Sequence, residues 1–221
     1  MREKMRYLTL LTCAFMALLP LQAKALTQNS KTEETVQTVT PDEIKRAESW
    51  LQNLHTAQAR FIQTTGNGTQ LVGTFYLSRP GKLRFEYDPP LEDFIVADGV
   101  FIYFYDGELK EQTNAPIQAT LANFLLRKDF SFGGDITVAE SKRAGGFIQI
   151  KLVQTDEPEA GSLTFAFTED TLQLKKWRVT DPQGAMTEVE LFYLKTGLNL
   201  DPKLFVYIDP NQKDPKKRYN D

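Results

Sequence analysis

The sequence has very little of the residue types that most often build metal sites and nucleophilic catalytic sites. Its 221 residues include one cysteine, Cys13, and one histidine, His55. Zinc sites combine several Cys and His side chains, and an activated nucleophile needs a neighbouring base. The chain also has no Gly-x-Ser-x-Gly motif. We therefore predict no metal, no cofactor and no catalytic residue, with His55 simply ending a helix. A carboxylate pair acting on a glycoside is not excluded, but no motif favours one.

An apolar run of membrane-spanning length is also absent. The run Tyr7–Leu21 has 15 residues, is interrupted by threonines and a proline, and falls short of the roughly 20 residues that a spanning helix needs. Basic residues precede it, and the small residues Ala23 and Ala25 follow it, as in a signal peptide. Cys13 lies in the middle of the run, not at its end, where a lipidated cysteine would stand. We predict that residues 1–25 are a removed signal peptide and that the exported protein has no disulfide.

Basic residues are too few for a nucleic-acid-binding protein. Of the 26 basic and 29 acidic residues, four and one lie within residues 1–25, which leaves 22 basic and 28 acidic residues and a net charge of −6. Binding to nucleic acid depends on the neutralisation of phosphates by Lys and Arg. The charge balance therefore excludes this class of partner.

The exported chain divides into a polar lead-in and one domain. Residues 26–40 are polar and show no periodicity, so we expect them to be flexible. Residues 41–221 show no change of composition that would mark a second domain, and their length suits a single core. A polar tail begins at about Asp209.

The first predicted helix begins after the lead-in. Thr40 is a good N-cap, Pro41 suits the first helical position, and Glu43 completes a capping box. Apolar residues recur at helical spacing after it, at Ile44, Ala47, Leu51 and Leu54. One face of this helix must therefore pack on an apolar surface.

The stretch Thr69–Asp106 predicts four consecutive antiparallel strands. Its runs of β-branched and aromatic residues are cut at Arg79–Lys82, Asp88–Pro90 and Asp98–Gly99. Turn signals elsewhere bring the total to about eleven strands. The fold class is therefore mainly β, a curved antiparallel sheet that forms either a closed barrel or a sheet that does not close.

The register of the second and third strands raises a difficulty. If Arg79 and Lys82 are the outer pair of a two-residue turn, Tyr76 faces Phe85, and Phe75 falls on the opposite face. Both faces then carry large apolar side chains, whereas antiparallel sheets usually have one wet face. We therefore expect an apolar segment to cover part of the second face.

A short apolar helix is predicted between the strands, at Gln118–Arg127. Leu121, Phe124 and Leu125 stand at i, i+3 and i+4. This helix and the first helix are the candidates for the missing cover. Fifteen phenylalanines, of which only Phe15 lies in the signal, fill an ordinary core or surround an apolar cavity. Large apolar residues on both faces of the strands, together with the apolar helix, favour an apolar cavity over an ordinary core.

Three segments of the chain resemble the signature of a known family. They are GTFYLSRPGKLRFEYDPP (Gly73–Pro90), DFIVADG (Asp93–Gly99) and IYFY (Ile102–Tyr105). Together they are similar to the periplasmic outer-membrane lipoprotein carrier family, LolA. The resemblance extends back through the first predicted helix to Ala59–Thr64 and more weakly forward to Leu200–Phe205. The resemblance implies an unclosed antiparallel β-barrel with lid helices over an apolar cavity. The polar lead-in and the tail depart from the family pattern.

The resemblance also implies roles for particular residues. Arg79 occupies the position of an arginine that ties the sheet to the lid helices by hydrogen bonds; the alternative is an exposed turn residue. On this fold we expect the acyl-chain cavity to be lined by eleven apolar residues: Phe75, Leu77, Leu83, Phe85, Phe94, Val96, Ile102, Phe104, Leu121, Phe124 and Leu125.

The function that the resemblance implies is transport. A monomeric periplasmic carrier would receive acylated lipoproteins from an inner-membrane release transporter and pass them to an acceptor at the outer membrane. It would not be an enzyme. The alternatives are a sensing module for lipid or lipoprotein and a carrier of a non-protein lipid, because one fold can serve either purpose.

Overall fold

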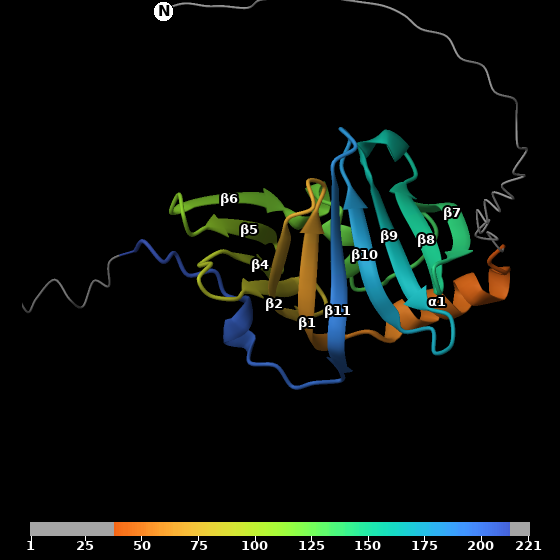
Figure 1. The fold of residues 1–221 in the computed structure, drawn as a ribbon, viewed down its shortest axis with the longest axis horizontal. Helices are drawn as coiled ribbons and strands as arrows, with labels where there is room; N and C mark the ends of the chain where they lie inside the picture. The colour runs from red at the N-terminus through yellow and green to blue at the C-terminus, as the bar shows by residue number, and fades with distance from the viewer. Residues whose placement is uncertain (1–37, 213–221) are drawn as a thin grey trace, which may run out of the picture. The chain divides into compact units, whose positions relative to one another are not determined.

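One antiparallel sheet of eleven strands dominates the computed structural model, which describes residues 38–212 (Figure 1). The strands are β1 (Thr56–Thr65), β2 (Gln70–Ser78), β3 (Lys82–Tyr87), β4 (Phe94–Asp98), β5 (Phe101–Asp106), β6 (Glu111–Pro116), β7 (Ile136–Ala144), β8 (Phe147–Gln154), β9 (Ser162–Thr168), β10 (Leu174–Thr180) and β11 (Met186–Thr196). The predicted signal peptide, most of the predicted lead-in and the end of the tail lie outside the described residues.

The strand order is β6-β5-β4-β3-β2-β1-β11-β10-β9-β8-β7. The edge strands β6 and β7 do not pair with each other, so the sheet does not close into a barrel. The predicted mainly β fold, with eleven antiparallel strands and an open sheet, is confirmed. Its strongly apolar face, called the inner face below, carries the core.

Helix α1 (Pro41–Asn53) lies on the inner face, below β8 and β9 in Figure 1. The predicted capping box is present, since the Thr40 side chain accepts from the Glu43 N–H and the Glu43 carboxylate accepts from the Thr40 N–H at 2.9 Å. The Trp50 ring packs edge-on against Phe167 of β9, with centroids 5.9 Å apart. Ala47 and Leu51 are fully buried, so the helix does bury the apolar face that its periodicity predicts.

The second predicted helix is divided into two pieces. Ile117–Ala119 forms the 3-10 turn η1 and Ala122–Leu126 forms helix α2. Between them Thr120 takes an extended conformation, and its hydroxyl donates to the Ile117 carbonyl at 2.8 Å. This local bond competes with a continuous helix, which is why the Gln118–Arg127 prediction was too long.

The register predicted for β2 and β3 is wrong. Ser78 pairs with Lys82, so the hairpin loop has three residues, Arg79–Gly81. In this register Leu77 faces Leu83, and Phe75 faces Phe85. A shift of one residue moves every side chain of a strand to the other face, so the large apolar residues of this hairpin share the inner face and the apparent conflict disappears.

The outer face of β3–β5 is covered by the C-terminal segment, not by the predicted helices. This segment consists of the 3-10 turn η3 (Pro202–Phe205) and the extended residues that follow. The ring of Tyr207 stacks on that of Tyr103, with centroids 4.6 Å apart, and the Leu204 carbonyl accepts from Arg84 at 3.4 Å. No helix among the described residues is long and apolar enough to cross a membrane.

Candidate functional site

A cavity of about 850 Å³ lies between the inner face of the sheet and helix α2. Strands from both ends of the sheet contribute to its wall. Its apolar lining residues are Leu71, Leu83, Phe85, Phe94, Ile95, Ile102, Phe104, Leu109, Leu121, Ala122, Leu125, Ala160, Leu163, Phe165, Trp177, Val179, Pro182 and Val189. A cavity of this size with a predominantly apolar lining suits an apolar ligand.

The exposed lining residues mark its mouth. Asp106 ends β5, Leu109 lies on the β5–β6 turn and Glu111 begins β6, and Leu109 is 66% exposed although it is apolar. Pro182, on the β10–β11 turn, is also exposed. We call the opening between these two turns the mouth of the cavity.

Seven of the eleven predicted cavity residues line it: Leu83, Phe85, Phe94, Ile102, Phe104, Leu121 and Leu125. The remaining four are buried elsewhere. Phe75 lies on the inner face, but its ring is covered by those of Phe85 and Trp177, at 4.9 and 5.3 Å. Leu77 is fully buried in the core.

The other two lie on surfaces that do not face the cavity. Val96 pairs with Arg84 and Tyr103 in the sheet register, which places it on the outer face. Phe124 is buried on α2, with the Arg127 guanidinium 5.6 Å from its ring. Parity along β4 and the direction of the helix decide these positions, and neither follows from apolar character alone. Phe94 shares the parity of Val96 and packs against Tyr105 and Tyr207, although its side chain also borders the cavity.

The wall contributed by β9–β11 was not predicted. Phe165, Trp177 and Val189 line it from three consecutive strands. The alternation of apolar and polar residues in these strands would have identified their inner face, since alternate residues of a strand point to the same side. The alternation alone does not predict that the inner faces of β9–β11 and β3–β5 enclose the same cavity.

Tyr87 is a polar side chain within the apolar lining. Its hydroxyl donates to the Gln63 side-chain oxygen at 2.8 Å. Burial raises the pKa of Tyr87 to about 12, so the phenol is neutral at physiological pH. The cavity therefore offers a neutral hydroxyl at this point.

Arg79 joins the sheet to the end of α1. Its Nε donates to the Leu54 carbonyl at 2.6 Å, and its terminal nitrogen donates to the Leu51 carbonyl. Its backbone N–H donates to the carbonyl of His55, at 2.7 Å, and its guanidinium lies 5.9 Å from the Phe130 ring. Burial lowers the pKa of Arg79 to about 10, which still leaves it cationic at neutral pH. His55 itself is exposed directly after α1.

The same hairpin loop also holds α2. The Gly81 N–H donates to the carbonyl of Leu126, the last residue of that helix, at 2.8 Å. Both covering helices therefore end at the Arg79–Gly81 loop. Carbonyls at a helix C-terminus have no partner within the helix, and the loop supplies these partners.

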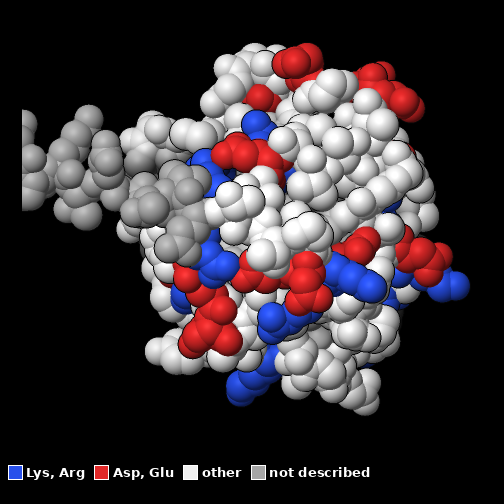
Figure 2. Space-filling view, turned by 90° about the vertical axis from the view of Figure 1, so that its right-hand side faces the viewer, with Lys and Arg blue, Asp and Glu red and all other residues white. Residues whose placement is uncertain are grey.

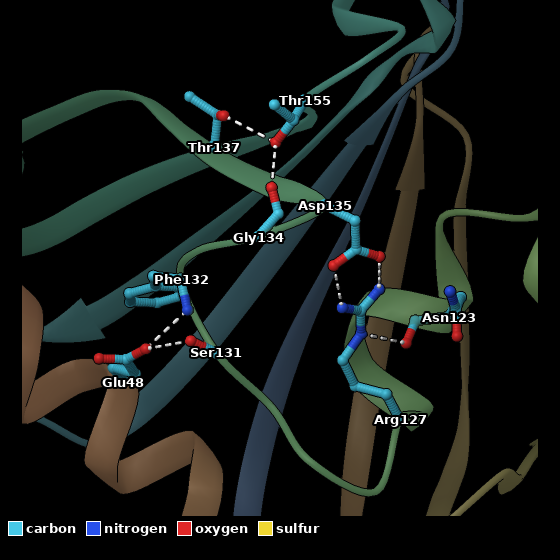
Figure 3. A network of polar contacts seen from close by, with 9 residues as sticks. All are labelled: Glu48, Asn123, Arg127, Ser131, Phe132, Gly134, Asp135, Thr137 and Thr155. Carbon is cyan, nitrogen blue, oxygen red and sulfur yellow. Dashed lines mark hydrogen bonds and ion pairs between the residues drawn. The ribbon is translucent and has the colours of Figure 1, made fainter.

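The segment between α2 and β7 runs along α1 and is fixed by polar contacts (Figure 3). Arg127 and Asp135 form a two-armed ion pair with distances of 2.8 and 3.0 Å. The Glu48 carboxylate accepts from the Phe132 N–H at 2.6 Å and from the Ser131 hydroxyl at 3.2 Å. These contacts connect α1, α2 and the start of β7.

The N-terminal end of α1 is held by a second group of charges. Glu43 contacts Arg143 of β7 at 2.5 Å, and Arg143 also contacts Glu169 at 3.3 Å. The hydrogen bond from the Thr40 N–H and the contact with Arg143 lower the pKa of Glu43 to about 2. Helix α1 is thus attached at both ends.

Within residues 38–212, no three His, Cys, Asp or Glu side chains come together in a way that would hold a metal ion. The side chains around the cavity are apolar apart from a few hydroxyls, one amide and four carboxylates. The arrangement can enclose an apolar group and shield it from water.

Comparisons with known proteins agree with this geometry. The profile of the family described as "Outer membrane lipoprotein carrier protein LolA" matches residues 52–208. An outer-membrane lipoprotein carrier protein of Methylococcus capsulatus is 31% identical over 173 residues, which are 75% of this chain and 83% of that protein. The corresponding protein of Azotobacter vinelandii is 28% identical over 180 residues, 77% of this chain and 86% of that protein.

Among solved structures, the crystal structure of a LolA superfamily protein from Nitrosomonas europaea is 10% identical, and the match covers 77% of this chain and 99% of that one, with a TM-score of 0.41.

Proposed function

Because the chain belongs to the LolA family of outer membrane lipoprotein carrier proteins, we propose that it is a periplasmic carrier of lipoproteins. It shields the acyl chains of its cargo and takes them from the inner membrane to the outer membrane. The observation that carries the proposal is the cavity of about 850 Å³ beneath α2, with its apolar wall.

The physical need for such a cavity is large. Exposure of an acyl chain to water costs about 0.8 kcal/mol per CH₂ group, so a chain of roughly sixteen carbons costs on the order of 10 kcal/mol. A lipoprotein therefore does not cross an aqueous compartment unaided. In the cavity, apolar side chains replace the water around an acyl chain. Because the cavity offers few polar partners, the acyl chain is shielded without specific contacts that would slow its release.

Arg79 is the residue that we propose to hold the lid, defined as α1, η1 and α2, in place. Its contacts with the Leu51 and Leu54 carbonyls support this role. A lid held by a few hydrogen bonds has two states, and cargo shifts the balance between them by binding one state better. The acyl-chain contacts of Leu83, Phe85, Leu121 and Leu125 belong to the same proposal.

The carrier acts between two membrane partners. An inner-membrane release transporter supplies the acylated lipoprotein, and an acceptor at the outer membrane takes it, with the carrier as a monomer. The chemistry needs no catalytic residue, since no covalent bond of the cargo changes.

The proposal is tested by a release assay. Purified protein is added to spheroplasts that make radiolabelled lipoproteins, and the soluble fraction is analysed for labelled lipoprotein bound to the protein. We expect a stoichiometric complex. Lipid extracted from the purified protein without release of lipoprotein would instead indicate a non-protein lipid carrier or a sensing module.

Two phenylalanines of β5 give a matched pair of variants. Phe104 lines the cavity and is 40% exposed, whereas Phe101 does not line it and is 37% exposed. The Phe104→Asp variant should lose the complex because a charge then faces the acyl chains, and Phe101→Asp should keep it. Equal yields from the two variants would contradict a cargo site in this cavity.

A further inference from the structure

The charged residues that line the cavity are all acidic. They are Asp93, Asp106, Glu111 and Asp181, and neither Lys nor Arg is among the lining residues. Asp106 ends β5 and Glu111 begins β6, Asp93 precedes β4, and Asp181 begins the β10–β11 turn. The carboxylates therefore lie at the ends of strands that border the mouth, around an otherwise apolar wall.

This distribution differs from that of the surface seen in Figure 2. On that face, basic and acidic side chains are interspersed. Ion pairs elsewhere, such as Arg127–Asp135 and Arg60–Asp88, neutralise many carboxylates. Within the described part of the chain none of the four mouth carboxylates belongs to an ion pair. Lys110 lies on the β5–β6 turn but forms no ion pair with them within the described residues, so the four carboxylates leave an excess of negative charge at the opening.

Three of these four carboxylates accept hydrogen bonds from nearby backbone N–H groups, and each does so through only one of its two oxygens. Asp93 Oδ1 accepts from the Gly107 N–H at 2.7 Å, and Asp106 Oδ1 accepts from the Leu109 N–H at 2.8 Å. Asp181 Oδ1 accepts from two N–H groups of its own turn. An asparagine oxygen would serve these turns equally well, so the turns alone do not require the negative charge.

We propose that the four carboxylates of the mouth make the carrier select acylated cargo that lacks an anionic headgroup, so that lipoproteins enter and anionic phospholipids are rejected. The inference rests on the proposed function, since it assumes that acyl chains occupy the cavity. Selectivity is a difference of affinities, and repulsion of the wrong ligand achieves it as well as attraction of the right one.

The chemistry of the two ligands supports this reading. A phospholipid carries its phosphate on the glycerol, next to the acyl esters, so chains inserted into the cavity place the phosphate at the mouth. The glycerol of a lipoprotein is instead joined to cysteine through an uncharged thioether. Only the phospholipid therefore brings a negative charge close to the four carboxylates. Each such pair interacts weakly in water, but four of them act together and in part through low-dielectric protein.

The test compares two probes with identical acyl chains. One is a synthetic lipopeptide whose acylated cysteine is followed by uncharged residues, and the other is phosphatidylglycerol. Displacement of a fluorescent fatty-acid analogue from the purified protein measures both affinities. We expect the lipopeptide to bind at least about ten-fold more tightly.

The quadruple variant D93N/D106N/E111Q/D181N removes the charge and retains oxygens that accept the turn hydrogen bonds. It should bind phosphatidylglycerol about ten-fold more tightly than the wild type does, with little change for the lipopeptide. The matched control E86Q/E140Q/D170N/E190Q removes the same charge from residues that do not line the cavity, and it should leave both affinities unchanged.

Ionic strength gives a readout that needs no variant. High salt should strengthen phosphatidylglycerol binding to the wild type, because salt screens exposed charges. Equal wild-type affinities for the two probes, or an unchanged phosphatidylglycerol affinity in the quadruple variant, would overturn the inference and leave the carrier function standing. Absence of lipopeptide binding would overturn the carrier function, and this inference with it.

Discussion

Arg79 is a partly buried cation that has no acidic partner in hydrogen-bonding contact among residues 38–212. Its partners are carbonyl oxygens at the end of α1 and the face of an aromatic ring. The C-terminal end of a helix carries a partial negative charge, which offsets part of the cost of burying the guanidinium. These contacts tie the sheet to the end of α1.

Replacement of Arg79 by Leu should therefore affect delivery more than binding. The variant loses the bonds to the Leu51 and Leu54 carbonyls, so the amides at the end of α1 should exchange faster with solvent. Soluble complexes should still form, but transfer to outer membranes should fall by at least about ten-fold, a loss of about 1.4 kcal/mol in coupling. Arg178→Leu, on an exposed arginine of β10, is the control. Normal transfer by the Arg79 variant would disprove the lid role.

Gly73 lies where the backbone of β2 is in close contact with the backbone of β3 and with the Phe61 ring. A Cβ at this position would lie 2.2 Å from the Glu86 carbonyl and 2.7 Å from the Phe61 ring. Gly73→Ala should reduce the free energy of unfolding by about 1–3 kcal/mol, the usual range for overpacking. Denaturant titration would measure this. Gly133→Ala is the control, because the added Cβ would meet only the Ser131 side chain at 3.7 Å; similar losses in both variants would contradict the steric account.

At the scale of elements, α1 differs from α2 in how it is attached. Its first turn contacts Arg143 through Glu43, its middle contacts the loop at Phe132 through Glu48, and its last carbonyls bind Arg79. Helix α2 has only five residues, and its last carbonyl is held by Gly81. Helix α2 therefore lines the cavity with fewer polar attachments than α1 has.

The attachment of α1 at Glu43 should make stability depend on pH. The pKa of Glu43 is lowered from 4.5 to about 2 in the folded protein. A carboxyl with a lowered folded pKa stabilises the protein above its unfolded pKa, and the contribution is lost as the pH falls towards the folded value. The free energy of unfolding should therefore decrease between pH 4.5 and pH 2, and less steeply in Glu43→Gln.

Denaturant titrations across this pH window would check the dependence. Arg143→Gln should flatten the curve less than Glu43→Gln does, because the larger cause of the shift is the hydrogen bond from the Thr40 N–H. Parallel curves for the wild type and Glu43→Gln would contradict the assignment.

Local signals explain which elements the sequence predicts well. The capping box and the apolar periodicity of α1 are properties of neighbouring residues, and the structure agrees with both. Strand β6 was missed because Glu111–Pro116 has few residues that favour strands. It is an edge strand that pairs only with β5, where a terminal proline is tolerated.

Non-local features account for the errors. The β2–β3 register depends on whether the hairpin loop has two or three residues, and Pro80–Gly81 fits both. The cover of the outer face comes from Leu204 and Tyr207, about 100 residues beyond the strands that they cover. The cavity was predicted in kind, but its β9–β11 wall requires the whole sheet to be curved and in register. The sequence pattern of a strand predicts which of its side chains share a face of the sheet. Which of these faces enclose the cavity depends on the curvature of the whole sheet.

At the scale of the whole described molecule, the volume of the cavity should determine how much of an acyl chain the protein can hold. Ala122 lines the cavity from the start of α2, whereas Ala119 is exposed in η1 and does not line it. Ala122→Phe should fill space that cargo needs. If the ring displaces about two CH₂ groups of an acyl chain, affinity should fall roughly ten-fold at about 0.8 kcal/mol per group.

Dye displacement by the lipopeptide would measure this loss, with Ala119→Phe as the control. The thermal stability of Ala122→Phe in the absence of cargo should not fall, because the ring enters space that is already open. Unchanged affinity in this variant would show that acyl chains lie elsewhere.

The pairing of β1 with β11 joins the first and last strands of the chain, with Ala57 opposite Thr196. These partners are about 140 residues apart, so this ladder closes the longest loop of the sheet and incurs a correspondingly large entropy cost. The meanders on either side, β2–β6 and β7–β10, are local and can form as each is synthesised. Until β11 arrives, however, the apolar inner faces of the two meanders have no common core, and the nascent chain carries exposed surface of the kind that aggregates. We therefore expect the apolar surface of the folding chain to need protection from water and from other chains until its last strand has paired.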